Sequence, residues 1–170
     1  MLKRLLLWSA SVLLLSVSLR ADSYHLLSLA LYQPEATLEQ RVGTTVDMVS
    51  YVKALNAAAA AYFDALPPGH PGILNLVIAF KPSGKSKVWL VPQDAKLDKP
   101  ADLIKKLEAV PAPKPNGGPI AFCLHASLWG GTDATPFTQP PYPDEWLNAS
   151  PNSLKPLLIP DGVLDAIWKD

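Results

Sequence analysis

The sequence predicts an α+β domain, a mainly antiparallel sheet of three or four strands with two principal helices packed on one face. Three apolar segments alternate between two faces in the manner of strands, at 73–80, 86–91 and 120–129. Two amphipathic segments, at 45–66 and 100–110, space their apolar residues as helices do. Pro82-Ser83-Gly84 joins the first two strands and has the composition of a tight turn, which predicts a hairpin.

The segment 45–66 is the clearest helix in the sequence. Thr44 or Thr45 can cap it, and Asp47 lies in its first turn, where a carboxylate suits the helix dipole. Pro67-Pro68-Gly69 ends it. Its apolar stripe follows helical spacing and consists of Met48, Val52, Leu55, Ala59, Tyr62 and Leu66.

The other predicted elements follow from similar signals. A strand is expected at 23–33, then a loop or short helical turn at 34–43. Pro100 suits the first turn of the second helix, and the Pro-rich sequence from Pro111 to Pro115 ends it. A short helix is expected at 162–169, whereas the segment 130–160 carries seven prolines and shows no periodicity.

Residues 1–21 have the pattern of a cleavable secretory signal. Lys3 and Arg4 precede an uncharged stretch that ends at Leu19, before Arg20 and Asp22. That stretch is of signal-peptide length and is too short for a membrane anchor, which needs roughly 20 apolar residues. Cleavage after Ser18 or after Ala21 fits the small-residue rule, with Ala21 preferred. We therefore expect an exported protein, periplasmic or extracellular, with no membrane anchor after cleavage.

The remaining chain, 22–170, has the size of one domain. Three of the 15 basic residues lie in 1–21, so the domain carries 12 basic against 15 acidic residues and a net charge of −3. Such a balance makes nucleic acid an unsuitable partner. Cys123 is the single cysteine, so the domain has no internal disulfide and its core depends on packing.

The order of elements resembles the C-terminal domain of TonB-type energy transducers and related periplasmic modules. The resemblance covers about 47–131 and is carried by Pro71-Gly72, by Pro82-Ser83-Gly84-Lys85 and by the sequence PKPNGGPI at 113–120. It implies a sheet with helices on one face. It carries over no energy-transducing role, because the chain lacks the long Pro-rich spacer of that family and has no Tyr-Pro pair ahead of the first strand of the matching stretch.

No catalytic, cofactor-binding or metal-binding residues are predicted. Gly84-Lys85-Ser86 lacks the first glycine of a phosphate-binding loop and precedes a strand where that motif requires a helix. Ser50 and Lys53 match the S-x-x-K pattern of serine acyl enzymes without its companion motifs. Cys123 and His125 share one face of a strand, about 7 Å apart, so a thiolate–imidazole pair stays an open alternative.

The loop 137–146 is the candidate contact surface, because rigid aromatic residues lose little entropy when they bind a partner. The candidate partner-binding residues are Phe137, Tyr142, Trp146 and Trp89; the alternative is that the loop folds back over the sheet. A second candidate is an unpaired sheet edge such as 86–91.

These observations predict an exported, non-catalytic protein-binding module, of which an inhibitor of an exported toxin is one version. A small envelope hydrolase built around His125 is an alternative. Another is a carrier of an apolar ligand, which needs an internal cavity lined by Tyr62, Phe80 and Trp89. The sequence leaves the partner and the oligomeric state open.

Overall fold

The computed structural model describes residues 22–133, 139–149 and 161–169. Its elements in chain order are β1 (Tyr24–Leu31), α1 (Glu35–Arg41), α2 (Thr45–Asp64), β2 (Gly72–Phe80), β3 (Ser86–Pro92), α3 (Ala101–Glu108), β4 (Ile120–Leu128), α4 (Asp144–Ala149) and α5 (Asp161–Ile167). The predicted signal segment 1–21 and the candidate residue Phe137 lie outside the described residues. Among the described residues, no helix is both long and apolar enough to cross a membrane.

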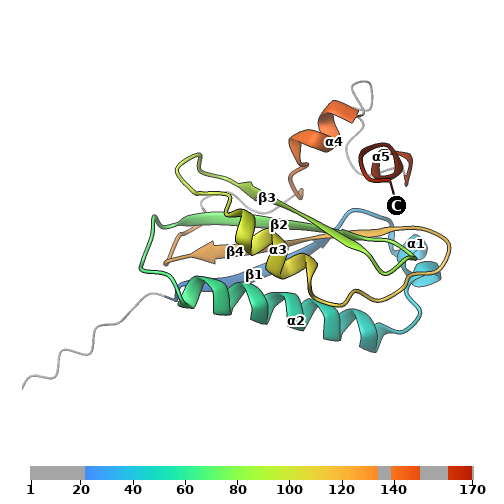
Figure 1. The fold of residues 1–170 in the computed structure, drawn as a ribbon, viewed down its shortest axis with the longest axis horizontal. Helices are drawn as coiled ribbons and strands as arrows, with labels where there is room; N and C mark the ends of the chain where they lie inside the picture. The colour runs from blue at the N-terminus through green and yellow to red at the C-terminus, as the bar shows by residue number, and fades with distance from the viewer. Residues whose placement is uncertain (1–21, 134–138, 150–160, 170) are drawn as a thin grey trace, which may run out of the picture.

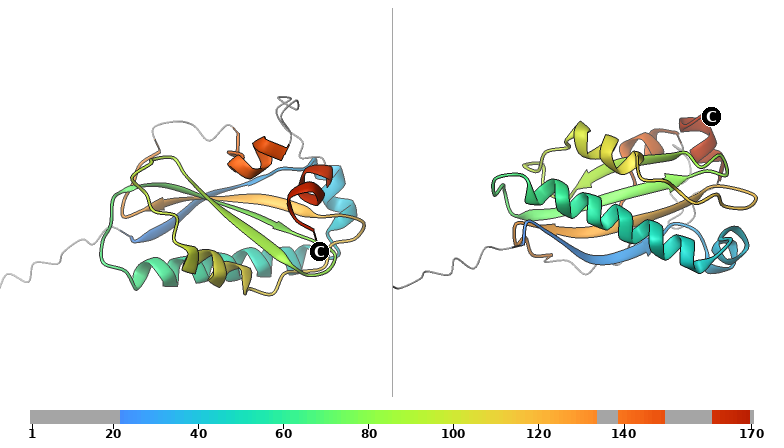
Figure 2. Two further views of the ribbon diagram at one scale, coloured as in Figure 1. Left: turned by 45° about the horizontal axis from the view of Figure 1, so that its top comes forward. Right: turned by 60° about the horizontal axis from the view of Figure 1, so that its bottom comes forward.

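The four strands form one antiparallel sheet in the order β1-β4-β2-β3 (Figure 1). β4, the last strand in the chain, lies between β1 and β2, so β1 and β3 form the two edges. The helices α2 and α3 pack on one face of this sheet (Figure 2). The predicted α+β class and the two principal helices on one face are therefore confirmed.

The main core lies between the sheet and α2 and α3. Burial along α2 recurs every four residues at Tyr51, Leu55, Ala59 and Phe63, so one stripe of the helix faces the sheet. The sheet contributes alternate residues, including Leu74, Leu76, Ile78 and Phe80 from β2 and Phe122 and Leu124 from β4. Aromatic contacts connect the two layers, with Tyr51 edge-on to Phe80 and Tyr24 stacked on Phe63.

The other face of the sheet is covered by the C-terminal segment, which carries α4 and α5 (Figure 2). Trp146 and Leu164 pack there on the small residues Ala79, Ala121 and Cys123. α4 lies in the Pro-rich segment for which the sequence predicted no element. For 34–43 the sequence predicted a loop or a short helical turn, and the structure has the helix α1 there. The helix predicted at 162–169 is present as α5, which begins one residue and ends two residues earlier.

Among the described residues, three ion pairs join the sheet layer to this C-terminal segment. Each pairs a basic residue near the sheet with a carboxylate of the segment: Arg41 with Asp161 at 2.6 Å, Lys81 with Asp165 at 3.4 Å and Lys87 with Glu145 at 2.9 Å. Lys81 also donates a hydrogen bond to the Trp168 carbonyl oxygen at 2.6 Å. The segment is therefore fixed by polar contacts at its margin as well as by apolar packing.

Gly131 allows the turn after β4 to pack directly on the start of β2. A Cβ atom at this position would overlap the backbone of Gly72. We expect Gly131→Ala to lower the free energy of unfolding by about 2–3 kcal/mol, because the backbone has to move. Urea unfolding measures this change. Gly43→Ala is the matched control, since nothing lies near its added methyl group; equal unfolding midpoints for the two variants would contradict the packing described.

Candidate functional site

Cys123 and His125, which the sequence left open as a thiolate–imidazole pair, lie on β4. Their side chains lie on the sheet face that the C-terminal segment covers. Both contact the side chain of Asn75 on β2. His125 Nδ1 lies 2.7 Å from Asn75 Oδ1, and His125 Nε2 lies 2.8 Å from Asp133 Oδ2. The imidazole is 1% exposed.

The hydrogen bonds of this cluster determine where its protons lie. The Asn75 amide nitrogen donates to the Val91 carbonyl oxygen at 3.1 Å, which turns its oxygen toward His125. His125 Nδ1 therefore donates to that oxygen, and Nε2 lies within hydrogen-bonding distance of the Asp133 carboxylate. Both ring nitrogens are thus engaged inside the protein, which leaves no free base for a substrate.

The thiol of Cys123 is also committed to the interior. It donates to Asn75 Oδ1 at 3.8 Å, and burial raises the pKa of the thiol from 9.0 to about 12. A nucleophilic cysteine requires the opposite shift and access to solvent. The geometry thus supports a structural role for this cluster, which fixes the turn after β4 to the sheet.

The candidate contact aromatics, as far as they are described, lie against the sheet. Trp146 is 2% exposed and packs edge-on against Tyr32 and Trp89, with ring centroids 5.2 and 5.0 Å away. Tyr142 contacts both Tyr32 and Trp146. The indole nitrogen of Trp89 donates to Glu145 at 2.5 Å. The structure therefore brings Tyr142, Trp146 and Trp89 together as one intramolecular cluster.

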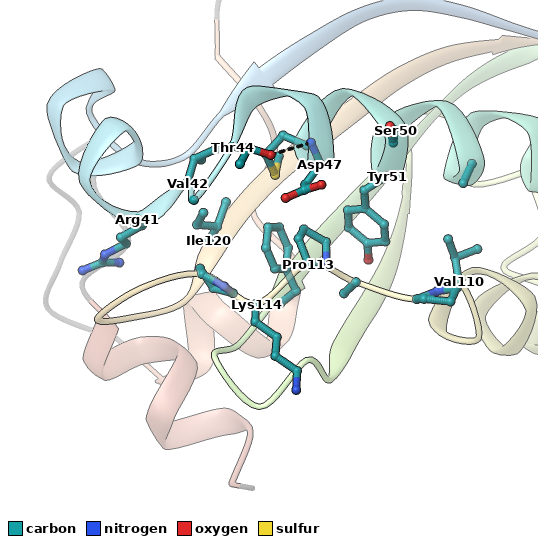
Figure 3. Close-up of a pocket in the computed structure, with 17 residues that line it drawn as sticks. Arg41, Val42, Thr44, Asp47, Ser50, Tyr51, Val110, Pro113, Lys114 and Ile120 are labelled. Atoms are coloured by element: carbon teal, nitrogen blue, oxygen red, sulfur yellow. Dashed lines mark hydrogen bonds between the residues drawn. The ribbon is translucent and has the colours of Figure 1, made fainter.

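A pocket of about 400 Å³ lies between the first half of α2 and the Pro-rich loop before β4 (Figure 3). Tyr51, Phe80 and Ile120 form part of its apolar wall, and Asp47 and Lys114 bring charge to it. Arg41 also lines it, but its guanidinium is held by Asp161 and the Pro119 carbonyl oxygen.

Among the described residues, exposed large apolar side chains are concentrated on β1 and α2. Six large apolar side chains are strongly exposed in the described part of the chain, and five belong to these two neighbouring elements. We call these five the β1–α2 surface: Leu27, Leu29 and Leu31, which are 42–46% exposed, and Val46 and Val49. The sixth residue, Leu147, lies on α4.

The backbone of β1 is also open along this edge. Tyr32 N–H donates to the Ala121 carbonyl oxygen, and Ala30 and Ser28 follow in register opposite Cys123 and His125. Because alternate residues of an edge strand point their N–H groups away from the neighbouring strand, those of Leu29 and Leu31 point outward. No hydrogen bond within the described residues engages them.

The opposite edge, β3, is the one that the sequence suggested for strand addition. β3 is indeed an edge, but its outward N–H groups are partly occupied or absent. Val88 N–H donates to the Glu108 side chain of α3 at 3.0 Å, and Pro92 has no N–H. Side chains that occupy edge groups, and proline at an edge, are devices that prevent pairing with another chain. The geometry therefore favours β1 as the accessible edge.

Sequence reasoning missed the β1–α2 surface. The apolar residues of 23–33 predicted a strand, but strand order decides whether such residues are central or at an edge, and the sequence does not give that order. One signal was present: Val46 and Val49 lie off the apolar stripe of their helix.

Comparison with known proteins found no matching family model, no matching curated protein and no matching solved structure. The resemblance to TonB-type C-terminal domains therefore stays a prediction.

A substitution at Asp133 tests the structural role of the buried cluster formed by His125, Asn75, Cys123 and Asp133. Asp133→Asn removes the charge that faces His125 while keeping the size of the side chain. We expect it to lower the free energy of unfolding by about 1–3 kcal/mol, the range for a weakened hydrogen bond to a charged group. Urea unfolding measures the change, with the exposed Asp98→Asn as control. An unchanged stability of the Asp133 variant would contradict the geometry.

Cys123 is expected to resist alkylation in the folded protein. Its pKa is raised by burial to about 12, so at about pH 8 the thiol stays protonated and inaccessible. Iodoacetamide labelling followed by mass spectrometry should show modification only in concentrated guanidinium chloride. Because the unfolded chain releases this proton above its ordinary pKa of 9.0, the free energy of unfolding should also fall as the pH rises from 9.0 toward about 12. Rapid labelling of the folded protein would show that the thiol is exposed.

Proposed function

We propose that this chain is an exported, non-catalytic protein-binding module that contacts another protein through the β1–α2 surface. The single observation that carries the proposal is that, of the six exposed large apolar side chains in the described part of the chain, five lie on two neighbouring elements. Apolar groups gathered in this way mark interaction sites more often than single exposed residues do. The outward N–H groups of Leu29 and Leu31 add hydrogen-bonding capacity to the same surface.

The proposal that the protein is exported rests on residues 1–21, whose sequence pattern is that of a secretory signal. The net charge of −3 on the domain fits a protein partner better than nucleic acid. An inhibitor of an exported toxin is the specific version that we retain, since it needs a binding surface and no chemistry.

The two alternative functions draw less support from the geometry. A hydrolase around His125 needs an accessible ring nitrogen, and both nitrogens are bonded inside the protein. A carrier needs one cavity lined by Tyr62, Phe80 and Trp89, yet these residues border three separate pockets. Neither alternative has a feature comparable to the β1–α2 surface.

The proposal is tested by affinity capture from the envelope and medium of the host, with the full-length protein carrying a C-terminal tag. Leu29→Lys places a charge in the centre of the surface and should lower partner recovery at least about tenfold, because a buried unpaired charge opposes binding. Leu29 is 42% exposed in the free protein, so the folded state should tolerate the lysine. Quantitative mass spectrometry compares the recovered proteins.

Leu147→Lys is the matched control, since it changes an exposed leucine on α4, outside the β1–α2 surface. Its recovery of the partner should equal that of the wild-type protein. A partner retained equally by both variants would place the contact elsewhere, and recovery lost only with Leu147→Lys would place it on the C-terminal segment. Far-UV circular dichroism confirms that each variant is folded.

A further inference from the structure

We infer that the partner binds as an added fifth strand along β1, through an extended segment with alternating apolar residues and a carboxylate that reaches Lys53. This inference rests on the proposed function and specifies the chemistry of its partner. Three features of the structure carry it: the open backbone of β1, the flank of α2 beside it, and the charge on that flank.

The first feature is the hydrogen-bonding geometry of β1. The N–H groups of Leu29 and Leu31 lie two residues apart, about 7 Å along the strand, and face outward. An extended segment can pair with both groups at once. Their side chains share the sheet face of Leu124 and Phe122, which is the face that α2 covers. A strand added here would therefore place alternate side chains against these leucines and the helix.

The second feature is the flank of α2 that faces this edge. Near the C-terminal end of α2, Phe63 stacks on Tyr24, and Asp64 accepts a hydrogen bond from Ser23. Helical spacing places a stripe on the same side of the helix, composed of Val49, Lys53, Asn56 and Ala60. The residues Asp47, Ser50 and Ala54 lie on the opposite flank, where they line the pocket of Figure 3.

The third feature is the positive charge of this stripe, which is free to bind a partner. Lys53 is exposed, and among the described residues no ion pair reaches its ammonium group. An added segment that supplies a carboxylate at this level would pair with it.

The same lysine disfavours a second copy of this chain as the occupant. α2 runs antiparallel to β1, with Phe63 level with Tyr24. Leu29 lies about 17 Å further along β1, which corresponds to about 11 residues of α2 and is therefore level with Val52 or Lys53. Two chains paired antiparallel about Leu29 would bring their Lys53 ammonium groups together. Like charges at this point oppose self-association, whereas a carboxylate is attracted.

The test uses a phage-displayed library of random octapeptides, selected on the immobilised full-length protein. We expect enriched peptides to alternate apolar with polar residues and to contain Asp or Glu. A synthetic peptide of the enriched sequence should bind the Leu29→Pro variant at least about tenfold more weakly, because this change removes an outward N–H group and leaves the ladder to β4 intact. Leu29→Ala keeps the N–H group and should lose less affinity.

Lys53→Glu is the second variant, and it keeps the inference testable if Leu29→Pro fails to fold. It should reverse the charge preference, so that a peptide with Lys in place of the acidic residue binds better than the original. Isothermal titration calorimetry measures both peptides. Equal binding by a folded Leu29→Pro variant, or an unchanged charge preference in Lys53→Glu, would overturn the inference.

Two further outcomes separate this inference from the proposed function. If no peptide is enriched while partner capture still depends on Leu29, the surface binds a folded partner and only strand addition is refuted. If sedimentation shows a dimer of the wild-type protein that Leu29→Pro dissociates, a second copy occupies the edge and the inference is wrong. The inference is supported if the enriched peptides are acidic, alternate apolar with polar residues, and bind more weakly when the N–H group of Leu29 is removed.

Discussion

The rest of the structure depends on one constraint, the burial of the two central strands on both faces. Every residue of β4 and all but the first of β2 are buried. A sheet of this kind needs a cover on each side, because burial of its apolar residues provides much of the driving force for folding. The helices α2 and α3 cover one face. The C-terminal segment has to cover the other, which explains why Trp146 and Leu164 face inward.

The two covers differ in composition because the two sheet faces differ. The face under α2 presents large side chains such as Phe80 and Phe122, which the long helix matches with Tyr51, Leu55 and Phe63. The other face presents small or polar groups, including Ala79, Ala121 and Asn75. Small floor residues leave room for the bulky ring of Trp146. The polar groups are satisfied by one another and by Asp133, so this face is stable without being reactive.

The sequence was sufficient to predict the fold class, the hairpin and the helix 45–66, because each depends on local periodicity and on turn or capping residues that lie nearby in the chain. It was insufficient for the C-terminal segment, where α4 forms around Trp146 through contacts with Tyr32 and Trp89 that are distant in sequence. The order of the strands in the sheet could not be predicted from the sequence either. Insertion of β4 beside β1 brings Cys123 opposite Ala30 and leaves Leu29 at an edge, and no local pattern encodes that pairing.

The contrast between the two edges gives the binding proposal its physical basis. β3 has a helix beside it whose Glu108 occupies an N–H group, so the fold protects that edge with its own residues. β1 also has a helix beside it, but the flank of α2 at this edge consists of valine, lysine, asparagine and alanine, and among the described residues none of these occupies the outward N–H groups. Unprotected edges favour association with another chain. A protein that protects one edge and leaves three leucines on the other therefore has an asymmetry that a binding partner explains.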